Sequence, residues 1–137
     1  MEKEQTVTKP TLIYPDKSTY TGQWLNNQYH GYGVRTWPNG ERYEGFYEYD
    51  LRSGKGKYYF ANGSVYDGRW KAGKRSGYGV FIWGNQETYQ GYHLDDAKNG
   101  HGKYWFTSGN IYHGEYKDGN KHGYGRVIFK NGNKFEG

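Results

Sequence analysis

The sequence predicts an all-β protein, a single-layer antiparallel meander with one β-hairpin per 23-residue repeat. Three observations lead to this prediction. A phrase of an aromatic residue with Gly two positions later recurs every 23 residues, at Tyr20, Tyr43, Tyr66, Tyr89, Tyr112 and Phe135. A Gly-x-Gly phrase repeats in phase with it, from Gly31–Gly33 to Gly123–Gly125. Turn residues follow Gly-x-Gly in most repeats, and no segment shows the periodicity of a helix.

Each repeat is predicted to contain two strands and a tight turn. Asn-Gly between short alternating runs is the strongest short-range sign of a hairpin, and it occurs at Asn39-Gly40, Asn62-Gly63 and Asn131-Gly132. The first strand carries Tyr-x-Gly-x-aromatic, a polar turn follows it, and the second strand carries Gly-x-Gly. Units of this size bury apolar surface only against their neighbours, so we expect one continuous array.

The repeat also sets the expected boundaries. We expect a flexible N-terminal tail over residues 1–11 and the array over residues 12–137. The array begins with a half unit at 12–19, continues with full units that start at residues 20, 43, 66, 89 and 112, and begins a sixth unit at residue 135. The last strand, Lys134 to Gly137, has an exposed edge, so a homo-oligomer or larger assembly through this edge is an expectation.

The register follows if the turn is a three-residue loop with Gly in the left-handed conformation. Gly33 then faces Gly45, Arg35 faces Tyr43, and Gly31 faces Tyr47. The large rings and the glycines share one face, so the rings cover the bare backbone of both glycines of Gly-x-Gly. A two-residue turn at this position would place rings and glycines on opposite faces.

Composition favours a folded, non-enzymatic protein. Aromatic residues make up 20% of the chain although only 33% is hydrophobic, whereas disordered chains are poor in aromatics. The chain has no Cys, no apolar stretch typical of a signal peptide and no run long enough to span a membrane, so we expect a cytoplasmic protein. The sequence contains no catalytic constellation and no cofactor motif. His93 and His101 flank one turn, but a metal would need further ligands, and Asp95 and Asp96 are candidates only because they are near in sequence, so no metal site is expected.

The aromatic face is the predicted partner-binding surface. A single layer cannot bury every ring, and exposed aromatic patches mark interaction sites. We expect a helix or an extended segment of a protein partner to lie on this face, whereas nucleic acid is not expected because packing needs the rings. The candidate contact residues are Tyr43, Tyr47, Tyr66, Trp70, Trp83, Tyr89 and Phe106.

A row of cations leaves a second hypothesis open. Basic residues recur at one register beside the polar turns, and the candidates are Arg52, Lys74, Arg75, Lys98 and Lys121. The net charge is +5. This edge could bind anionic phospholipids, or its cations could simply protect the sheet edge from aggregation. Acidic residues among them, such as Asp50 and Asp118, favour edge protection.

These phrases resemble the MORN (membrane occupation and recognition nexus) repeat, whose pattern is Tyr-x-Gly-x-Trp, a polar turn, His-Gly-x-Gly and an aromatic before Asp/Asn-Gly. Tyr66-Asp-Gly68-Arg-Trp70 followed by Gly77-Tyr-Gly79 is a close match. Ser53, Ser76, Gln86, His93 and Asn99 depart from the pattern. The resemblance implies an elongated, twisted ribbon that acts as a scaffold in a cytoskeletal or ciliary assembly such as an axoneme or radial spoke. It also implies, as alternatives, a peripheral membrane module or an accessory domain of a larger enzyme.

Overall fold

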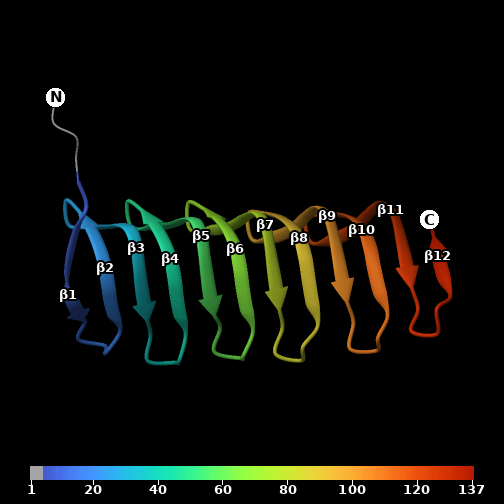
Figure 1. The fold of residues 1–137 in the computed structure, drawn as a ribbon, viewed down its shortest axis with the longest axis horizontal. Helices are drawn as coiled ribbons and strands as arrows, with labels where there is room; N and C mark the ends of the chain where they lie inside the picture. Colours follow the sequence, from blue (N-terminus) through green and yellow to red (C-terminus); the bar gives the residue numbers. More distant parts are fainter. Residues whose placement is uncertain (1–4) are drawn as a thin grey trace.

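A computed structural model describes residues 5–137 as a single open antiparallel sheet of 12 strands (Figure 1). The strands pair strictly in chain order, so the predicted all-β hairpin meander is confirmed. Their bounds are β1 (Val7–Ile13), β2 (Thr19–Leu25), β3 (Gln28–Thr36), β4 (Arg42–Glu48), β5 (Leu51–Tyr59), β6 (Val65–Lys71), β7 (Lys74–Ile82), β8 (Thr88–Leu94), β9 (Ala97–Trp105), β10 (Ile111–Lys117), β11 (Asn120–Ile128) and β12 (Lys134–Glu136).

Three-residue loops join the strands along one edge of the sheet. Between β3 and β4, the Trp37 amide donates to the Glu41 carbonyl at 3.0 Å, and Gly40 takes the left-handed conformation with φ of 91°. The side chain of Asn39 accepts a hydrogen bond from the Glu41 amide at 3.0 Å, which fixes the loop. This is the loop that the Asn-Gly pattern predicts. Gln86 replaces Gly in the equivalent loop and still adopts φ of 75°.

Two-residue turns join the strands along the opposite edge. Both turn residues have positive φ, as at Asn26 and Asn27 (48° and 66°) and at Asp95 and Asp96 (48° and 71°). This is the type I′ geometry, whose twist matches that of the flanking strands. Neighbouring turns are linked, since the Asp96 amide donates to the Arg75 carbonyl of the preceding hairpin at 3.0 Å.

The predicted register is correct, and it extends across the sheet. Gly33 pairs with Gly45, Arg35 with Tyr43, and Gly31 with Tyr47. The same pairing recurs in the hairpins β5–β6, β7–β8 and β9–β10, and the hairpins closed by two-residue turns also pair Gly with Gly. One line of glycines, which we call the glycine row, therefore crosses consecutive strands from β2 to β11. Its members are Gly22, Gly33, Gly45, Gly56, Gly68, Gly79, Gly91, Gly102, Gly114 and Gly125.

The two glycines of Gly-x-Gly have different roles. The second lies in the glycine row, where a side chain would collide with a Tyr ring. The first is needed for its backbone: Gly31, Gly54 and Gly77 have φ of 91°, 71° and 98°. It stands beside a β-bulge, because the pairing shifts just after the glycine row, for example between Gly45 and Tyr47. The expectation that the rings cover both glycines is therefore corrected for the first one.

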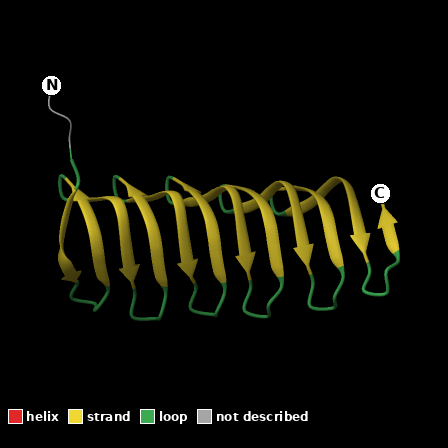
Figure 2. Cartoon of the chain, viewed as in Figure 1, coloured by secondary structure: helices red, strands yellow, loops and turns green. Residues whose placement is uncertain are grey.

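The sheet is strongly curved. Figure 2 shows the strands arching over toward the edge that carries the two-residue turns. Bulges bend strands and increase their twist, and here one follows the glycine row in each of the hairpins that a two-residue turn closes, namely β2–β3, β4–β5, β6–β7, β8–β9 and β10–β11. The two halves of each strand therefore pack on the same rings, and the concave face, called the inner face below, largely covers itself.

The N-terminal expectation needs a correction. Residues 7–11 belong to β1, which pairs with β2 through Val7–Trp24 and Lys9–Gly22, so they are not a tail. The free edge of β2 offers unpaired backbone groups that an extended segment can satisfy. The pairing is irregular between Lys9 and Leu12, where Pro10 lacks an amide hydrogen. Of the remaining predicted tail, residues 5 and 6 lie outside any strand, and residues 1–4 lie outside the described residues.

The core is a row of Tyr rings that lies over the glycine row. Tyr20, Tyr43, Tyr66 and Tyr89 are fully buried. Each hydroxyl donates to the carbonyl of the residue three positions later, which is the bulged residue; the Tyr66 bond to the Arg69 carbonyl is 2.9 Å long. Burial raises the pKa of Tyr66 to about 12, so the hydroxyl remains a donor at neutral pH. The Tyr hydroxyl thus provides a hydrogen bond to a carbonyl that the bulge leaves without a partner on the neighbouring strand.

This packing predicts different costs for two Gly→Ala substitutions. A Cβ at Gly56 would lie 2.5 Å from Cζ and 2.6 Å from Cε1 of Tyr43, whereas a Cβ at Gly63 meets nothing within 4 Å. We expect Gly56→Ala to lower the free energy of unfolding by about 3 kcal/mol. Gly63→Ala, which only strains a left-handed residue, is expected to cost about 1 kcal/mol. Urea unfolding of both variants measures this, and equal costs would contradict the assignment of the glycine row.

Candidate functional site

Most of the predicted partner contacts lie in the core. Tyr43, Tyr66 and Tyr89 are 0% exposed, and Tyr47 and Trp70 are 6% and 5% exposed. A partner cannot reach these side chains in the folded protein, so the prediction is wrong for these five as contact residues. It fails because a single layer is expected to leave its rings partly exposed, whereas the bend at each bulge closes the inner face over them. Trp83 and Phe106 are the two candidates that remain partly exposed.

Trp83 and Phe106 belong to a continuous aromatic track. Together with Trp37 and Phe60 they occupy one register, just before the three-residue loops, and we call these four residues the inner aromatic row. All four are partly buried and pack against the core. Each later ring rests on a neighbour two positions earlier, with centroids 4.6 Å apart for Tyr58–Phe60, 4.4 Å for Phe81–Trp83 and 4.5 Å for Tyr104–Phe106. The row therefore offers firmly supported rings at a surface.

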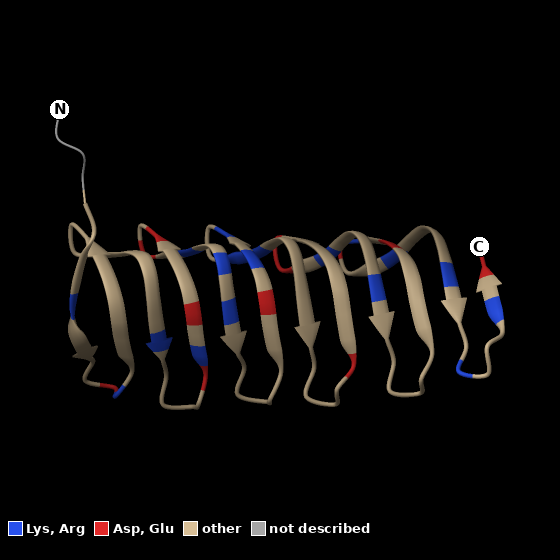
Figure 3. Cartoon of the chain, in the orientation of Figure 1, with Lys and Arg blue, Asp and Glu red and all other residues tan. Residues whose placement is uncertain are grey.

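The predicted basic edge is not an outward row of free charges. The Arg52 guanidinium lies 4.7 Å from the Trp70 ring centroid and donates to the Gly73 carbonyl at 2.9 Å. The Lys98 ammonium lies 5.2 Å from the ring centroids of Tyr104 and Tyr116. Such contacts stabilise cations over aromatic faces. Arg75 is also half-buried, whereas Lys74 and Lys121 are exposed. Figure 3 shows basic and acidic residues interspersed along the strands.

His93 occupies a place that other repeats give to a larger ring. Its register equivalents are Tyr47, Trp70 and Tyr116, and it is 5% exposed. The imidazole stands edge-on between Tyr66 and Tyr89, with centroids 5.0 and 5.1 Å away. Its Nδ1 atom is buried without a hydrogen-bond partner. Beside it is a cavity of about 300 Å³ that Trp83 and Lys98 also line.

The outer face carries exposed aromatic pairs that are not among the contact residues predicted from the sequence. Tyr32 pairs with Phe46, and Tyr78 with Tyr92; all four are 46–50% exposed. The rings of each pair meet edge to face at 5.6 Å. Charged or polar pairs alternate with them, Lys55–Arg69 between the two and His101–Glu115 beyond. The alternation is visible in the sequence at the middle position of Gly-x-Gly, which is occupied in turn by Tyr32, Lys55, Tyr78 and His101.

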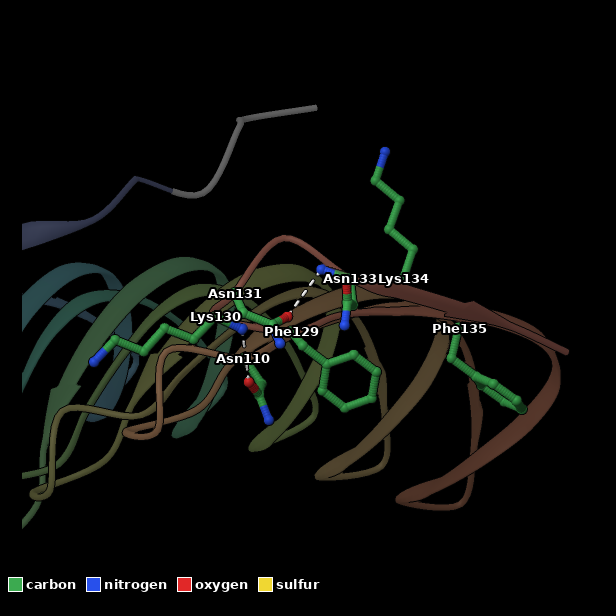
Figure 4. Close-up of a pocket in the computed structure, with 7 residues that line it drawn as sticks. All are labelled: Asn110, Phe129, Lys130, Asn131, Asn133, Lys134 and Phe135. Carbon is green, nitrogen blue, oxygen red and sulfur yellow. Dashed lines mark hydrogen bonds between the residues drawn. The ribbon is translucent and has the colours of Figure 1, made fainter.

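A broad pocket of about 780 Å³ lies at the hairpin of β11 and β12. In Figure 4, the Phe129 and Phe135 rings hang on one side of the hairpin and Lys134 points away from them. These rings are 40% and 64% exposed, in contrast to the buried Tyr row. Among the strands of residues 5–137, β12 pairs only with β11, so Phe135 lacks the second neighbouring strand that Tyr112 has. Edge pairing with another chain stays a prediction.

The residues considered for a metal do not converge. His93 lies on the inner face and pairs with Lys98, whereas His101 is exposed and its Nε2 is 3.5 Å from a Glu115 carboxylate oxygen. Within residues 5–137, no group of three or more His, Cys, Asp or Glu side chains is arranged to hold a metal ion. That same stretch has no helix long and apolar enough to cross a membrane.

His93 predicts a dependence of stability on pH. Burial, followed by the nearby charges of Arg75 and Lys98, lowers its pKa from 6.5 to about 4. The unfolded chain therefore binds the proton more readily, so this contribution is complete above pH 6.5 and is lost as the pH falls toward 4. The shift corresponds to roughly 3 kcal/mol at most. Urea unfolding between pH 7 and pH 4 should show a smaller loss in His93→Tyr than in the wild type, and identical pH profiles would contradict the buried neutral imidazole.

Comparisons with known proteins agree with this geometry. A segment of 45 residues, 33% of this chain, is 42% identical to Alsin of Mus musculus and to Alsin of Homo sapiens, but it spans only 3% of each of those proteins. Among solved structures, the TCP domain of SAS-4 (dCPAP) of Drosophila melanogaster, in complex with a proline-rich motif of Ana2 (dSTIL), superposes with a TM-score of 0.52 over 97% of this chain and 82% of that domain. At 16% identity this likeness concerns the fold alone.

The family comparison covers most of the chain. The MORN repeat model matches five consecutive segments, residues 20–42, 43–65, 66–88, 89–111 and 112–134. Each segment begins at a Tyr of the buried row and contains one second glycine of Gly-x-Gly. The match confirms the resemblance drawn from the repeated phrases. The chain belongs to the MORN repeat family.

Proposed function

We propose that this array is a non-enzymatic scaffold that binds a protein partner along the inner aromatic row. The observation that carries the proposal is that Trp37, Phe60, Trp83 and Phe106 stay partly exposed at one register in consecutive units. Aromatic rings held firmly at a surface are common anchors of protein interfaces, since they bury a large area at a small entropic cost.

The spacing of the row suits an extended partner segment. Equivalent residues are two strands apart, so neighbouring rings of the row are separated by roughly 10 Å and the whole row spans roughly 29 Å. A polyproline segment rises about 3.1 Å per residue and docks on aromatic-lined surfaces, so about nine residues would cover the row. The Drosophila domain of similar fold was solved with a proline-rich motif, which supports this class of partner.

The outer face fits a linear partner less well. Its aromatic pairs are more exposed, but the Lys55–Arg69 pair stands between Tyr32–Phe46 and Tyr78–Tyr92. An apolar segment that crossed this face would have to desolvate both cations. The inner aromatic row has a ring in each unit from Trp37 to Phe106, without such an interruption. Binding of anionic phospholipid is also less well supported, because Arg52 and Lys98 lie over core rings.

The setting of this scaffold is a further part of the proposal. We place it in a cytoskeletal or ciliary assembly on the resemblance of the repeats alone, since the fold itself supports binding and says nothing of location. The segment shared with Alsin covers so little of that protein that Alsin as a whole gives no guide to the partner.

Partner capture from native extract tests the proposal. We expect Trp83→Ala/Phe106→Ala to weaken binding of the captured protein at least tenfold, because a buried aromatic anchor contributes about 2 kcal/mol or more to an interface. The affinity is measured with the purified partner by isothermal titration calorimetry. Circular dichroism of the variant verifies that the sheet is intact.

The matched control is Phe46→Ala/Tyr92→Ala, which removes two exposed rings from the outer face. We expect this variant to bind as the wild type does. If the outer variant loses affinity and the inner variant keeps it, the partner lies on the outer face and the assignment to the inner aromatic row is wrong.

A further inference from the structure

The fourth unit has a cavity on the inner face where the neighbouring units have a ring. Tyr47, Trp70 and Tyr116 fill this register elsewhere, and His93 is the smaller replacement. One unit earlier, the Arg52 guanidinium rests 4.7 Å from the centroid of the Trp70 ring. Beside His93, the Arg75 guanidinium lies 5.0 Å from the centroid of the Phe81 ring and lines a cavity of about 300 Å³. The smaller His93 ring is the departure from the repeat that lines this space.

Two cations line this cavity. The Arg75 Nε atom is buried and makes no hydrogen bond, although Asp96 Oδ1 is 3.7 Å away. Lys98 is half-buried, and no acidic side chain of residues 5–137 forms an ion pair with it. Burial, together with the charge of Lys121, lowers the pKa of Lys98, as expected for an ammonium without a counter-ion. The site holds more positive charge than its own acids offset.

We propose that this cavity binds a single carboxylate between Arg75 and Lys98, namely the acidic side chain of a residue in the protein partner. The cavity itself is independent of the proposed function, but the source of the carboxylate rests on it. Trp83 belongs both to the cavity lining and to the inner aromatic row. An extended segment that lies on this row can therefore place an acidic side chain in the cavity.

The charge balance favours a monoanion. Asp96 partly offsets Arg75, and His93 is neutral near pH 7 because its pKa is lowered to about 4. Lys98 lies over aromatic rings but has no acidic partner among residues 5–137, so its single charge matches that of a carboxylate. A phosphate dianion would bring a second negative charge close to Asp96. Phe81 and Trp83 supply apolar walls for the methylene groups of a Glu side chain.

NMR of the full chain with two neutral-backbone probes tests the site. N-acetyl-glutamate amide carries one carboxylate, and N-acetyl-glutamine amide has nearly the same shape without charge. At pH 7 and constant ionic strength, we expect the glutamate probe to shift the His93 ring signals saturably and the glutamine probe to leave them unchanged. Inorganic phosphate is the third probe and is expected to bind more weakly than the glutamate probe.

Three variants locate the binding. His93→Trp fills the cavity with the ring that Trp70 places there in another unit, and we expect it to abolish saturable shifts of the Trp83 signals. Lys98→Gln should weaken binding at least tenfold. Lys103→Gln removes the same charge from β9 at a residue that lies over Trp105, outside the cavity, and should leave binding unchanged.

Several results would overturn the proposal. Equal shifts with both amide probes, retained binding in His93→Trp, or tighter binding of phosphate than of the glutamate probe would each exclude a carboxylate site here. Absence of any shift would do the same, and it would leave partner binding on the inner aromatic row standing, because that binding is measured separately with the Trp83→Ala/Phe106→Ala variant.

Discussion

The Tyr ring that lies over the glycine row is the contact on which the rest of the structure depends. Tyr66 covers Gly79 of the next strand, and a Cβ there would approach its ring within 2.6 Å. The same residue donates its hydroxyl to the Arg69 carbonyl, which the bulge leaves without a ladder partner. One side chain thus fills space, satisfies a buried acceptor and stabilises the bend. Because the contact recurs every 23 residues, the curved sheet has a continuous core without a second layer.

Because the core forms within one curved sheet, few of its aromatic side chains are accessible to a partner. The bend buries Tyr47 and Trp70, so the proposed partner is expected to contact the rings at the rim of the core or the pairs outside it. Departures from the repeat then become informative. His93 is buried and smaller than the Tyr or Trp that other units place at this register, and a cavity of about 300 Å³ lies beside it. A residue that differs from its equivalents in other units can therefore distinguish one part of a repetitive surface from another.

Turn residues and the alternation of side chains along strands predicted the fold well. They did not predict the bend of the strands at the bulges. Asn39-Gly40 specified the loop, and the parity of Tyr43 and Gly45 gave the correct register and face. The left-handed conformation of Gly31 was not foreseen, because Gly-x-Gly alone does not separate a glycine needed for φ from one needed for space. Without that bend, exposure was assigned to buried rings. Residues 7–11 of β1 were missed because they lack the repeated phrase, although any extended segment can pair with an open edge.

A double-mutant cycle between Tyr66 and Gly79 tests the central contact most directly. Urea unfolding of Gly79→Ala, Tyr66→Leu and the double variant gives the coupling between the ring and the bare backbone. If the ring occupies the space above Gly79, the smaller Leu relieves the clash, and the double variant should be more stable than the sum of the single losses by about 1–2 kcal/mol. Strictly additive losses would contradict the account, because they would mean that the ring and the glycine do not compete for the same space.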